Sequence, residues 1–497
     1  MAVAPISAKA KARTNVSATF SIASMKYHIQ TFGCQMNYSD SERIASVLER
    51  IGFDRANSEE DATMLIFNSC SVRQKAEDRI LGLRHTLKRL KNHNPALRIA
   101  ITGCMVRDTS TRKTEEKRDK ILRRMPEVDI AFQIKDLAAL PSLIQEIEPN
   151  LSIQTLDEHI RACEDGWSVP LGAKAKATDG SNINYFQIAP RISATYSSFV
   201  PIQSGCDKFC TYCIVPYARG REFSRPLDEI VQECTRLVEN GAVEITLVGQ
   251  TVNSYGLSAN DKKSGNFTKY GPSPFAHLLR QIDKLSEKGL RRLRFTSPHP
   301  RDFSDELIQT LAQLKTICPY IHMPVQSGDD AVLRRMNRNY LSQEYKDIMR
   351  RLRKAIPGVA ISTDIIVGFC SETDQEFENT YKMYDEMEWD MCFLARYSPR
   401  KGTYSYRQLK DDVPASVKAA RWHRLNSLLI AKALKKHKVF EGQTVEVLVT
   451  QQKGKKCIGR TPHFKEVHFS SDRNLVGQFA DVHITSAREF LLEGEEK

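Results

Sequence analysis

Stretches with strand character alternate with amphipathic helical stretches along most of this chain, and this alternation restricts its fold more than any other feature. In the first third, short apolar runs cover residues 27–33, 62–70 and 97–104. Helical patterns separate them at residues 39–53, where we expect a Ser or Asp cap, and at residues 73–91. Such alternation is typical of an α/β protein with a parallel sheet.

The same rhythm resumes later in the chain. Helical patterns such as 226–241 and 343–356 fall between six candidate strands at residues 197–203, 244–249, 291–297, 320–326, 360–369 and 391–398. Six repeats predict an incomplete (β/α)6 barrel rather than the full eight-fold one. The active site of such a barrel is expected at the carboxyl ends of its strands.

The last part of the chain changes period. After a basic helical stretch at residues 418–440, short runs alternate at period two, at residues 444–450, 456–462, 465–470 and 478–485. They predict a small β-barrel of about 60 residues, in the style of an oligonucleotide-binding fold. A purely structural cap is the alternative.

These patterns divide the chain into five segments. We expect a disordered tail at residues 1–25, with an organelle-transit segment as the weaker alternative. An N-terminal domain at 26–165 follows, in which the charged stretch 107–125 ends the strand–helix pattern. A linker at 166–198, a barrel core at 199–435 and the small barrel at 436–497 complete the chain.

Charge and hydropathy narrow the classes of partner. Lys and Arg number 73 against 60 Asp and Glu, a net charge of +13. A positive field favours a polyanion such as nucleic acid, although general solubility would also account for it. No apolar run approaches the roughly 20 residues that cross a bilayer, so we expect no membrane partner.

Three of the twelve cysteines follow the three N-terminal strands. Cys34, Cys70 and Cys104 each end one of these strands, and ligands of α/β sheets gather at the carboxyl ends of strands. The three thiols therefore predict a metal or cluster site, with buried core cysteines as the alternative. The scattered spacing of most other cysteines does not fit a secreted disulfide scaffold and favours a reducing, cytoplasmic compartment.

A second set of cysteines is closely spaced. Cys206, Cys210 and Cys213 form a CxxxCxxC motif directly after the first barrel strand. Three thiolates can hold three irons of a 4Fe-4S cluster and leave the fourth iron open to a small ligand. A zinc site would need a fourth ligand, and none stands at the usual spacing.

With these motifs the chain resembles the radical-SAM methylthiotransferase family over about residues 26–490. The resemblance implies an N-terminal methylthiotransferase domain, a radical-SAM barrel and a C-terminal RNA-binding TRAM domain. It implies two 4Fe-4S clusters, the reducing one on Cys206, Cys210 and Cys213, with S-adenosylmethionine on its open iron. Cys34, Cys70 and Cys104 would hold the auxiliary cluster, which takes part in sulfur delivery.

The resemblance also assigns an S-adenosylmethionine pocket. Its strings "GQ", "PVQSG" and "TDIIVGF" imply that the pocket is lined by Gly249, Gln250, Gln326, Asp364 and Gly368. Gln326 and Asp364 could equally be structural hydrogen-bonding residues.

Three sites depart from the family pattern. Val106 and Arg107 stand where Ala-Gln is common, Cys370 and Ser371 replace Pro-Gly, and Ser204 precedes Gly205 where an acid is frequent. None of these changes removes a cluster ligand.

Two strings, 31–37 ("TFGCQMN") and 68–78 ("NSCSVRQKAED"), resemble the branch acting on isopentenyladenosine. The implied reaction places a methylthio group on carbon 2 of N6-isopentenyladenosine at position 37 of tRNA. Alternatives are the threonylcarbamoyladenosine reaction and a non-catalytic iron–sulfur RNA-binding protein. Implied partners are the tRNA anticodon loop and a one-electron donor such as flavodoxin or ferredoxin, with the enzyme a monomer.

The small C-terminal barrel would supply affinity for phosphates. Its six basic candidates are Lys453, Lys455, Lys456, Arg460, Lys465 and Arg473. Because the barrel holds no cluster cysteine, we expect radical chemistry to be independent of it.

Overall fold

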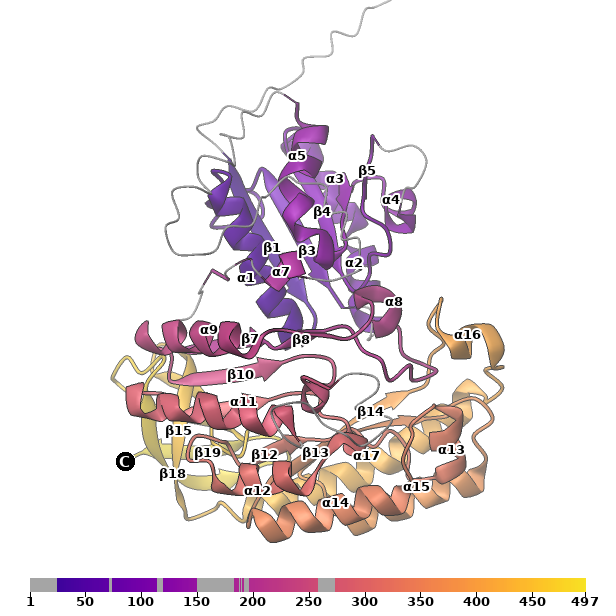
Figure 1. Cartoon of the computed structure of the whole chain (residues 1–497), viewed down its shortest axis with the longest axis vertical. Helices are drawn as coiled ribbons and strands as arrows, with labels where there is room; N and C mark the ends of the chain where they lie inside the picture. Colours follow the sequence, from indigo (N-terminus) through magenta and orange to yellow (C-terminus); the bar gives the residue numbers. More distant parts are fainter. Residues whose placement is uncertain are drawn as a thin grey trace, which may run out of the picture.

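The computed structural model describes residues 25–70, 74–113, 119–149, 183–186, 188, 190–191, 196–257 and 273–497. Residues 1–24 of the predicted tail, most of the predicted linker and Cys163 lie outside these residues. Figure 1 shows an N-terminal α/β unit stacked on the strand–helix barrel, with the small C-terminal barrel packed beside the latter.

The N-terminal unit is a six-stranded sheet in the order β2-β1-β3-β4-β6-β5, covered by helices. The three predicted strands are confirmed as β1, β3 and β4, which are adjacent and parallel. The elements are β1 (Lys26–Phe32), α1 (Gln35–Arg50), β2 (Asp54–Arg55), β3 (Met64–Ser69), α2 (Gln74–Gly82), α3 (Arg84–His93), β4 (Arg98–Gly103), β5 (Ser110–Thr111), α4 (Lys120–Arg124), β6 (Ile130–Ala131), α5 (Leu140–Ile147) and α7 (Ile183–Phe186).

The predicted start of the first helix is wrong. Helix α1 begins at Gln35, and its N-cap is Cys34 rather than a Ser or Asp. The amide oxygen of Asn37 accepts from the Cys34 backbone N–H at 3.1 Å, which replaces the expected cap. Ser39 and Asp40 are instead fully buried inside the helix, where they face the barrel.

The charged stretch 107–125 does not end the sheet pattern either. The sheet continues beyond β4 with β6 and β5, and β5 lies within this charged stretch. Asp119 shows how the stretch is held in place. The Asp119 carboxylate accepts from the backbone of Arg107, Asp108 and Ile121, so it satisfies three N–H groups of the segment.

The predicted barrel is confirmed as six parallel strands with helices outside. The strands form two three-stranded sheets, β11-β10-β7 and β12-β13-β14. A single bridge from Leu293 of β11 to Ile317, just before β12, joins the two sheets, whereas the described residues show no bridge between the edge strands β7 and β14, so the barrel is open there. The elements are β7 (Ser197–Pro201), β8 (Gln203–Ser204), α8 (Val215–Arg219), β9 (Phe223–Ser224), α9 (Leu227–Glu239), β10 (Glu244–Val248), α11 (Pro274–Asp283), β11 (Arg292–Phe295), α12 (Asp305–Gln313), β12 (Tyr320–His322), α13 (Asp330–Arg335), α14 (Ser342–Ala355), β13 (Ala360–Val367), α15 (Asp374–Met387), β14 (Met391–Arg396), α16 (Tyr404–Gln408) and α17 (Ala415–Lys438).

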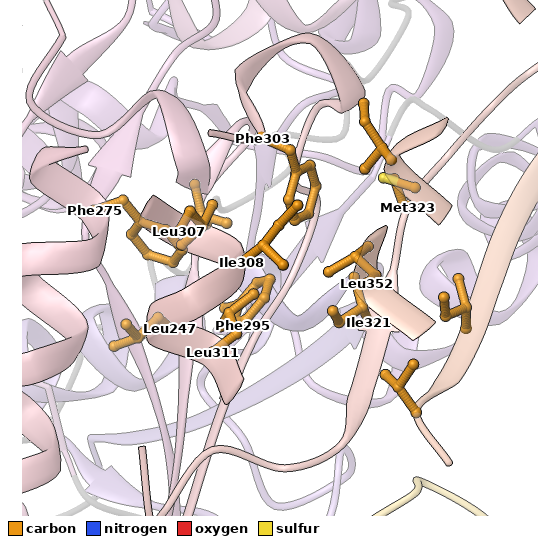
Figure 2. Close-up of a cluster of buried hydrophobic side chains, with 14 of the residues drawn as sticks. Leu247, Phe275, Phe295, Phe303, Leu307, Ile308, Leu311, Ile321, Met323 and Leu352 are labelled. Atoms are coloured by element: carbon orange, nitrogen blue, oxygen red, sulfur yellow. The ribbon is translucent and has the colours of Figure 1, made fainter. Parts of the chain in front are cut away.

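One large apolar core holds the barrel together. Figure 2 shows part of it, where Leu247, Phe275 and Phe295 meet Leu307 and Ile321 from the neighbouring helix and strand. All five side chains are at most 5% exposed. Burial of this kind contributes about 1.5–3 kcal/mol for each large side chain.

The C-terminal unit is a closed five-stranded barrel in the order β15-β16-β17-β19-β18. The four predicted strands are confirmed, and the short strand β19 was missed. The strands are β15 (Thr444–Lys453), β16 (Lys456–Arg460), β17 (Glu466–Ser470), β18 (Phe479–Ala487) and β19 (Leu492–Glu496).

Buried charges join the N-terminal unit to the barrel. Arg43 of α1 pairs with Glu233 of α9 at 3.2 Å, and Arg225 pairs with the same carboxylate at 2.8 Å. Tyr185 and Phe186, in the segment predicted as a linker, are 2% exposed and belong to the N-terminal core. Removing one partner of such a buried pair typically costs about 3–5 kcal/mol.

Arginines also anchor the C-terminal barrel. Arg292 and Arg294 of β11 are buried and donate to backbone carbonyls of Arg460 and Thr461 at 2.7 and 3.0 Å. Removal of the small barrel would leave these guanidinium groups without those acceptors. Whether radical chemistry is independent of the small C-terminal barrel should therefore be tested with point substitutions, because truncation would also disturb β11.

Two histidines make the C-terminal junction sensitive to acid. His437 of α17 is 5% exposed, and burial, together with the charge of Lys465, lowers its pKa to about 4. Burial lowers the pKa of His463 as well. The folded chain therefore binds these protons less readily than the unfolded chain, whose histidines titrate near 6.5.

We expect the contribution of these histidines to the free energy of unfolding to be fully present above about pH 6.5. It should fall as the pH drops toward 4, by up to about 1.4 kcal/mol per pH unit for each histidine. His437→Leu should flatten part of this dependence in thermal unfolding between pH 7.5 and 5. His423→Leu, at an exposed position of the same helix, should leave it unchanged. An unchanged slope in His437→Leu would contradict the assignment.

Candidate functional site

The first cysteine set lies at the carboxyl edge of three adjacent strands. Cys34 follows β1, Cys70 follows β3 and Cys104 follows β4, as the sequence predicted. Gly103, at φ +90°, permits the close approach, because a Cβ there would lie 2.4 Å from the carbonyl oxygen of Ser69. The strand order thus brings the three cysteines to one edge of the sheet.

Two asparagines tie these cysteine loops together. The Asn37 amide donates to Asn68 Oδ1 at 3.0 Å, and the Asn68 amide donates to the Asn37 carbonyl at 2.7 Å. Both side chains are fully buried. They belong to the two strings that carry the family resemblance, so the sequence marked them without assigning this role.

The electrostatics at Cys34 favour its thiolate form. A hydrogen bond from the Cys70 thiol lowers the pKa of Cys34 to about 6, and the charge of Arg219 acts in the same direction. Arg219 Nε also donates to Cys104 Sγ at 3.4 Å. Because metal ligation requires a deprotonated thiol, this environment suits an iron site.

Arg219 itself comes from the barrel. It is the last residue of α8, and its guanidinium pairs with the buried carboxylate of Asp40 at 2.5 Å. Tyr185 donates to the other oxygen of that carboxylate at 2.5 Å. A cation fixed by two elements of the N-terminal unit therefore lies beside the thiols of Cys34 and Cys104.

The second cysteine set occupies the loop after β8, at the mouth of the barrel. Gly205, at φ +80°, permits the turn, since a Cβ would lie 2.0 Å from the Arg221 carbonyl oxygen. Cys206 Sγ lies 3.3 Å from Thr251 Oγ1, beyond the end of β10. Burial raises the pKa of both Cys206 and Cys213.

This set has its own buried arginine. Arg338 Nη1 donates to Cys210 Sγ at 3.6 Å, and its other nitrogens reach Tyr340 and the Pro324 carbonyl. Arg219 lies six residues beyond Cys213 and adjoins the motif in the sequence. Arg338 lies 128 residues from Cys210 and carried no sequence signal.

The two sets lie at opposite ends of a short helix. Helix α8 starts two residues after Cys213 and ends at Arg219, so it spans only about 7 Å at 1.5 Å per residue. Throughout the part of the chain that the structure describes, no three His, Cys, Asp or Glu side chains converge on a point that could hold one ion.

Of the predicted pocket residues, Gly249, Gln250, Gln326 and Gly368 follow the carboxyl ends of β10, β12 and β13, and Asp364 lies within β13. Gln326, at φ +73°, bridges to the strand that carries Asp364, and its backbone N–H donates to the Asp364 carbonyl at 2.8 Å. The half-exposed Asp364 carboxylate lies 3.4 Å from His322 Nε2. Phe393 of β14 is in register with Asp364 and is 43% exposed.

The three other predicted residues have different surroundings. A Cβ on Gly249 would lie 2.7 Å from the Gln203 side chain, which approaches it from beside the cysteine loop. The Gln250 amide oxygen is buried without a hydrogen-bond partner among the described residues. Gly368 packs against the Lys418 side chain, and its N–H donates to Glu372 at 2.6 Å. The structure thus groups Gly249 and Gln250 near Cys206 and gives Gly368 a packing contact.

Three of the residues that depart from the family pattern, Arg107, Cys370 and Ser371, have local explanations. Ser371 adopts φ +60°, a conformation that glycine reaches without strain, and Asp412 accepts from both its N–H and its hydroxyl. Cys370 is buried in a small apolar cluster with Phe369 and Tyr397. Arg107 donates to the Cys104 carbonyl and so supports the loop of that cysteine.

Three family models match the chain in the observed order. The model of uncharacterized protein family UPF0004 covers residues 26–132, the radical SAM superfamily model covers 200–384 and the TRAM domain model covers 438–496. Among solved structures, a radical S-adenosylmethionine methyltransferase, TsrM, from Kitasatospora setae aligns with a TM-score of 0.46 and 12% identity, covering 75% of this chain and 73% of that one.

Curated relatives extend over nearly the whole chain. The tRNA-2-methylthio-N(6)-dimethylallyladenosine synthase of Bacillus pumilus is 38% identical over 95% of this chain and 85% of its own length. The synthase of the same name from Clostridium botulinum strain Langeland is 38% identical over 95% of this chain and 97% of its own length. The chain therefore belongs to the radical-SAM methylthiotransferases, in the family of the tRNA-2-methylthio-N(6)-dimethylallyladenosine synthases.

Proposed function

We propose that this enzyme transfers a methylthio group to carbon 2 of N6-isopentenyladenosine at position 37 of tRNA. The observation that carries the proposal is the pair of cysteine sets joined by α8, each with a buried arginine at a thiol. The names of the relatives support the same reaction.

Each cysteine set would hold one 4Fe-4S cluster. Cys206, Cys210 and Cys213 fit the cluster that binds S-adenosylmethionine, because three thiolates leave one iron open. The set of Cys34, Cys70 and Cys104 fits an auxiliary cluster, since the pKa of Cys34 is lowered and Arg219 donates to Cys104. When bound, the first cluster and S-adenosylmethionine supply a radical able to attack an unactivated C–H bond, which no protein side chain can do.

The chain's own residues orient and shield these groups. Arg338 and Arg219 place positive charge beside the sulfur atoms of Cys210 and Cys104. Gln250 and Gln326, beyond the ends of β10 and β12, and Asp364 within β13 would offer polar contacts for S-adenosylmethionine. Because α8 is only five residues long, it would keep the two clusters close to each other and to the target base.

The proposed reaction also requires an RNA substrate, an electron donor and a reducing compartment. We infer that the substrate is the tRNA anticodon loop, whose base can be unstacked at low cost, and that a flavodoxin- or ferredoxin-type donor supplies electrons to a monomeric enzyme. All eleven cysteines within the described residues are free thiols, which supports a reducing cytoplasmic setting. None of the described helices combines the length and the apolarity that a membrane span requires. The domain limits 26–165, 199–435 and 436–497 are also proposals.

Mass spectrometry of tRNA nucleosides tests the reaction directly. A strain that lacks this enzyme should accumulate N6-isopentenyladenosine and lose its 2-methylthio derivative, and the restored gene should reverse both changes. Loss of the methylthio derivative of threonylcarbamoyladenosine instead would assign the enzyme to the other tRNA branch. An unchanged nucleoside profile would favour the non-catalytic alternative.

The iron content should reveal two separate clusters. Anaerobically reconstituted enzyme should carry about eight irons, four for each cluster. Joint replacement of Cys206, Cys210 and Cys213 by Ala should leave about half, as measured by iron and sulfide analysis. Cys457→Ala, in the core of the C-terminal barrel, is the matched control and should retain all the iron. Full iron in the triple variant would refute the assignment of the barrel loop.

The two clusters should also be separable in function. Cys34→Ala, Cys70→Ala or Cys104→Ala should abolish methylthiolation while reductive cleavage of S-adenosylmethionine continues, because cleavage requires only the barrel cluster. Chromatography of 5′-deoxyadenosine and of the modified nucleoside measures the two steps. If a correctly folded variant loses cleavage as well, the steps are not independent.

The structure reduces the set of basic residues that can meet phosphates. Lys465 is 6% exposed and pairs with Asp390 at 2.9 Å, so its predicted phosphate contact is wrong. Lys455, Arg460 and Arg473 pair with acids of the same barrel. Lys453 and Lys456 are exposed and form no ion pair with any residue that the structure describes.

We therefore expect Lys453→Ala with Lys456→Ala to lower the slope of log affinity against log salt for tRNA by up to about two units. Filter binding across a salt series measures this slope, and S-adenosylmethionine cleavage should persist. Lys435→Ala, which removes an exposed lysine already paired with Glu388, controls for net charge. An unchanged slope in the double variant would leave the C-terminal barrel as a structural cap.

A further inference from the structure

Exposed aromatic side chains gather around the cysteine loop of the barrel. Among the described residues, seven aromatic side chains are strongly exposed: Tyr38, Phe209, Tyr217, Phe393, Tyr404, Tyr406 and Phe490. Four of them, Phe209, Tyr217, Tyr404 and Tyr406, belong to that loop, to α8 directly after it, or to α16. Exposed rings incur a hydration cost, so such a concentration at one site calls for a ligand.

Backbone and side-chain contacts hold these elements together. The Ser405 N–H of α16 donates to the Thr211 carbonyl of the cysteine loop at 2.8 Å, and Tyr397 donates to the Ser405 hydroxyl at 2.9 Å. Tyr404 and Tyr406 flank that fixed serine. Arg407 lies over the Tyr217 ring at 5.7 Å and donates to its hydroxyl at 3.4 Å. The rings therefore project from anchored backbone.

The position of these rings relates them to the barrel opening. The cysteine loop follows β7 and the short β8, and α16 follows β14; no bridge joins the edge strands β7 and β14 among the described residues. The contact between Ser405 and Thr211 therefore crosses the open side of the barrel at its carboxyl end. A macromolecular substrate that presents a base to this mouth would meet the rings first.

The chemistry of the rings and their partners fits single-stranded RNA. Bases that are splayed from a loop stack on aromatic rings and on guanidinium planes. Arg221 lies over Phe209 at 5.4 Å, and Arg407 over Tyr217, so cations accompany two of the rings. The side chain of Arg221 is 72% exposed and pairs with Asp207 of the cysteine loop at 2.7 Å, which holds its guanidinium beside the Phe209 ring.

We propose that Phe209, Tyr217, Tyr404 and Tyr406 form a stacking platform for the anticodon-loop nucleotides on either side of the target adenosine. This inference rests on the proposed function and assigns to the platform the capture of the loop. Neighbouring bases stack on the platform, so the adenosine between them is presented to the barrel mouth. The phosphate contacts of Lys453 and Lys456 are a separate contribution.

The test measures binding of an anticodon stem–loop RNA that carries N6-isopentenyladenosine at position 37. Tyr217→Ala and Tyr406→Ala should each weaken binding by about 5- to 150-fold, the usual loss for one base–aromatic stack. The salt slope should not change, because no phosphate contact is removed. Tyr217→Phe and Tyr406→Phe keep the ring and should bind almost as the wild type does.

A direct signature of stacking is the fluorescence of 2-aminopurine placed beside the target adenosine. The wild type should quench this fluorescence, and the matching Ala variant should not. Phe490→Ala removes a ring of 47% exposure in the C-terminal barrel and should change neither affinity nor quenching. Thermal unfolding checks each variant, and Tyr406→Ala carries the test if Tyr217→Ala does not fold.

The outcomes separate this inference from the proposed function. If the wild type binds the stem–loop no better than the same stem closed by an unrelated loop, the assignment of the anticodon loop as substrate fails. If the wild type prefers the stem–loop and both Ala variants bind equally well, the platform is overturned. Normal RNA binding with slower reduction by flavodoxin would also overturn it, since the rings would then dock a protein.

Discussion

The buried pair of Arg219 and Asp40 is the interaction on which the site depends most. Its side chains are 2% and 0% exposed, so both charges have lost nearly all their water. Such desolvation is offset only by excellent geometry and additional hydrogen bonds. Tyr185 supplies one on the carboxylate, and the Cys104 sulfur accepts another from the guanidinium. The barrel's cysteine loop and the N-terminal thiols therefore cannot shift independently without leaving a buried charge unpaired.

The same physical device recurs at the other junctions. Between α1 and the strand–helix barrel, the Glu233 carboxylate pairs with both Arg43 and Arg225. Two arginines of β11 donate to backbone carbonyls of the C-terminal barrel. Guanidinium groups suit these positions because their planar donors satisfy several acceptors at once. The sequence divides the chain into three units by their different strand and helix patterns, but buried ion pairs and hydrogen bonds join these units in the folded chain. Substitutions at a junction report on docking as well as on the unit that carries them.

Regular periodicity explains how much of this structure could be predicted. All six barrel strands, the three cysteine-bearing N-terminal strands and four of the five C-terminal strands are visible as local patterns. The cysteines could be placed at strand ends, because parallel strands bring their carboxyl ends to one edge. Residues that join the site through contacts between distant parts of the sequence could not be predicted. Arg338 reaches Cys210 across 128 residues, and no local pattern marks it.

Two errors show how tertiary contacts override local signals. Ser39 and Asp40 looked like helix caps, but Cys34 and Asn37 form the cap, and the barrel uses Ser39 and Asp40 as buried contacts. Lys465 looked like a phosphate ligand, but Asp390 of the barrel binds it. In each case a polar residue that suits solvent was recruited to a junction between units. A sequence read one unit at a time cannot supply the partner.

The open barrel links these junctions to substrate access. Strand β14 is an edge, and α17 covers it on one side, where Trp422 donates to the Leu394 carbonyl at 3.2 Å. Its other face keeps Phe393 exposed beside Asp364. A closed eight-stranded barrel would fill that interior with packed side chains. Because pairing stops at six strands, β14 keeps an unpaired edge, and the buried ion pair of Arg219 and Asp40 fixes the two cysteine sets on either side of α8.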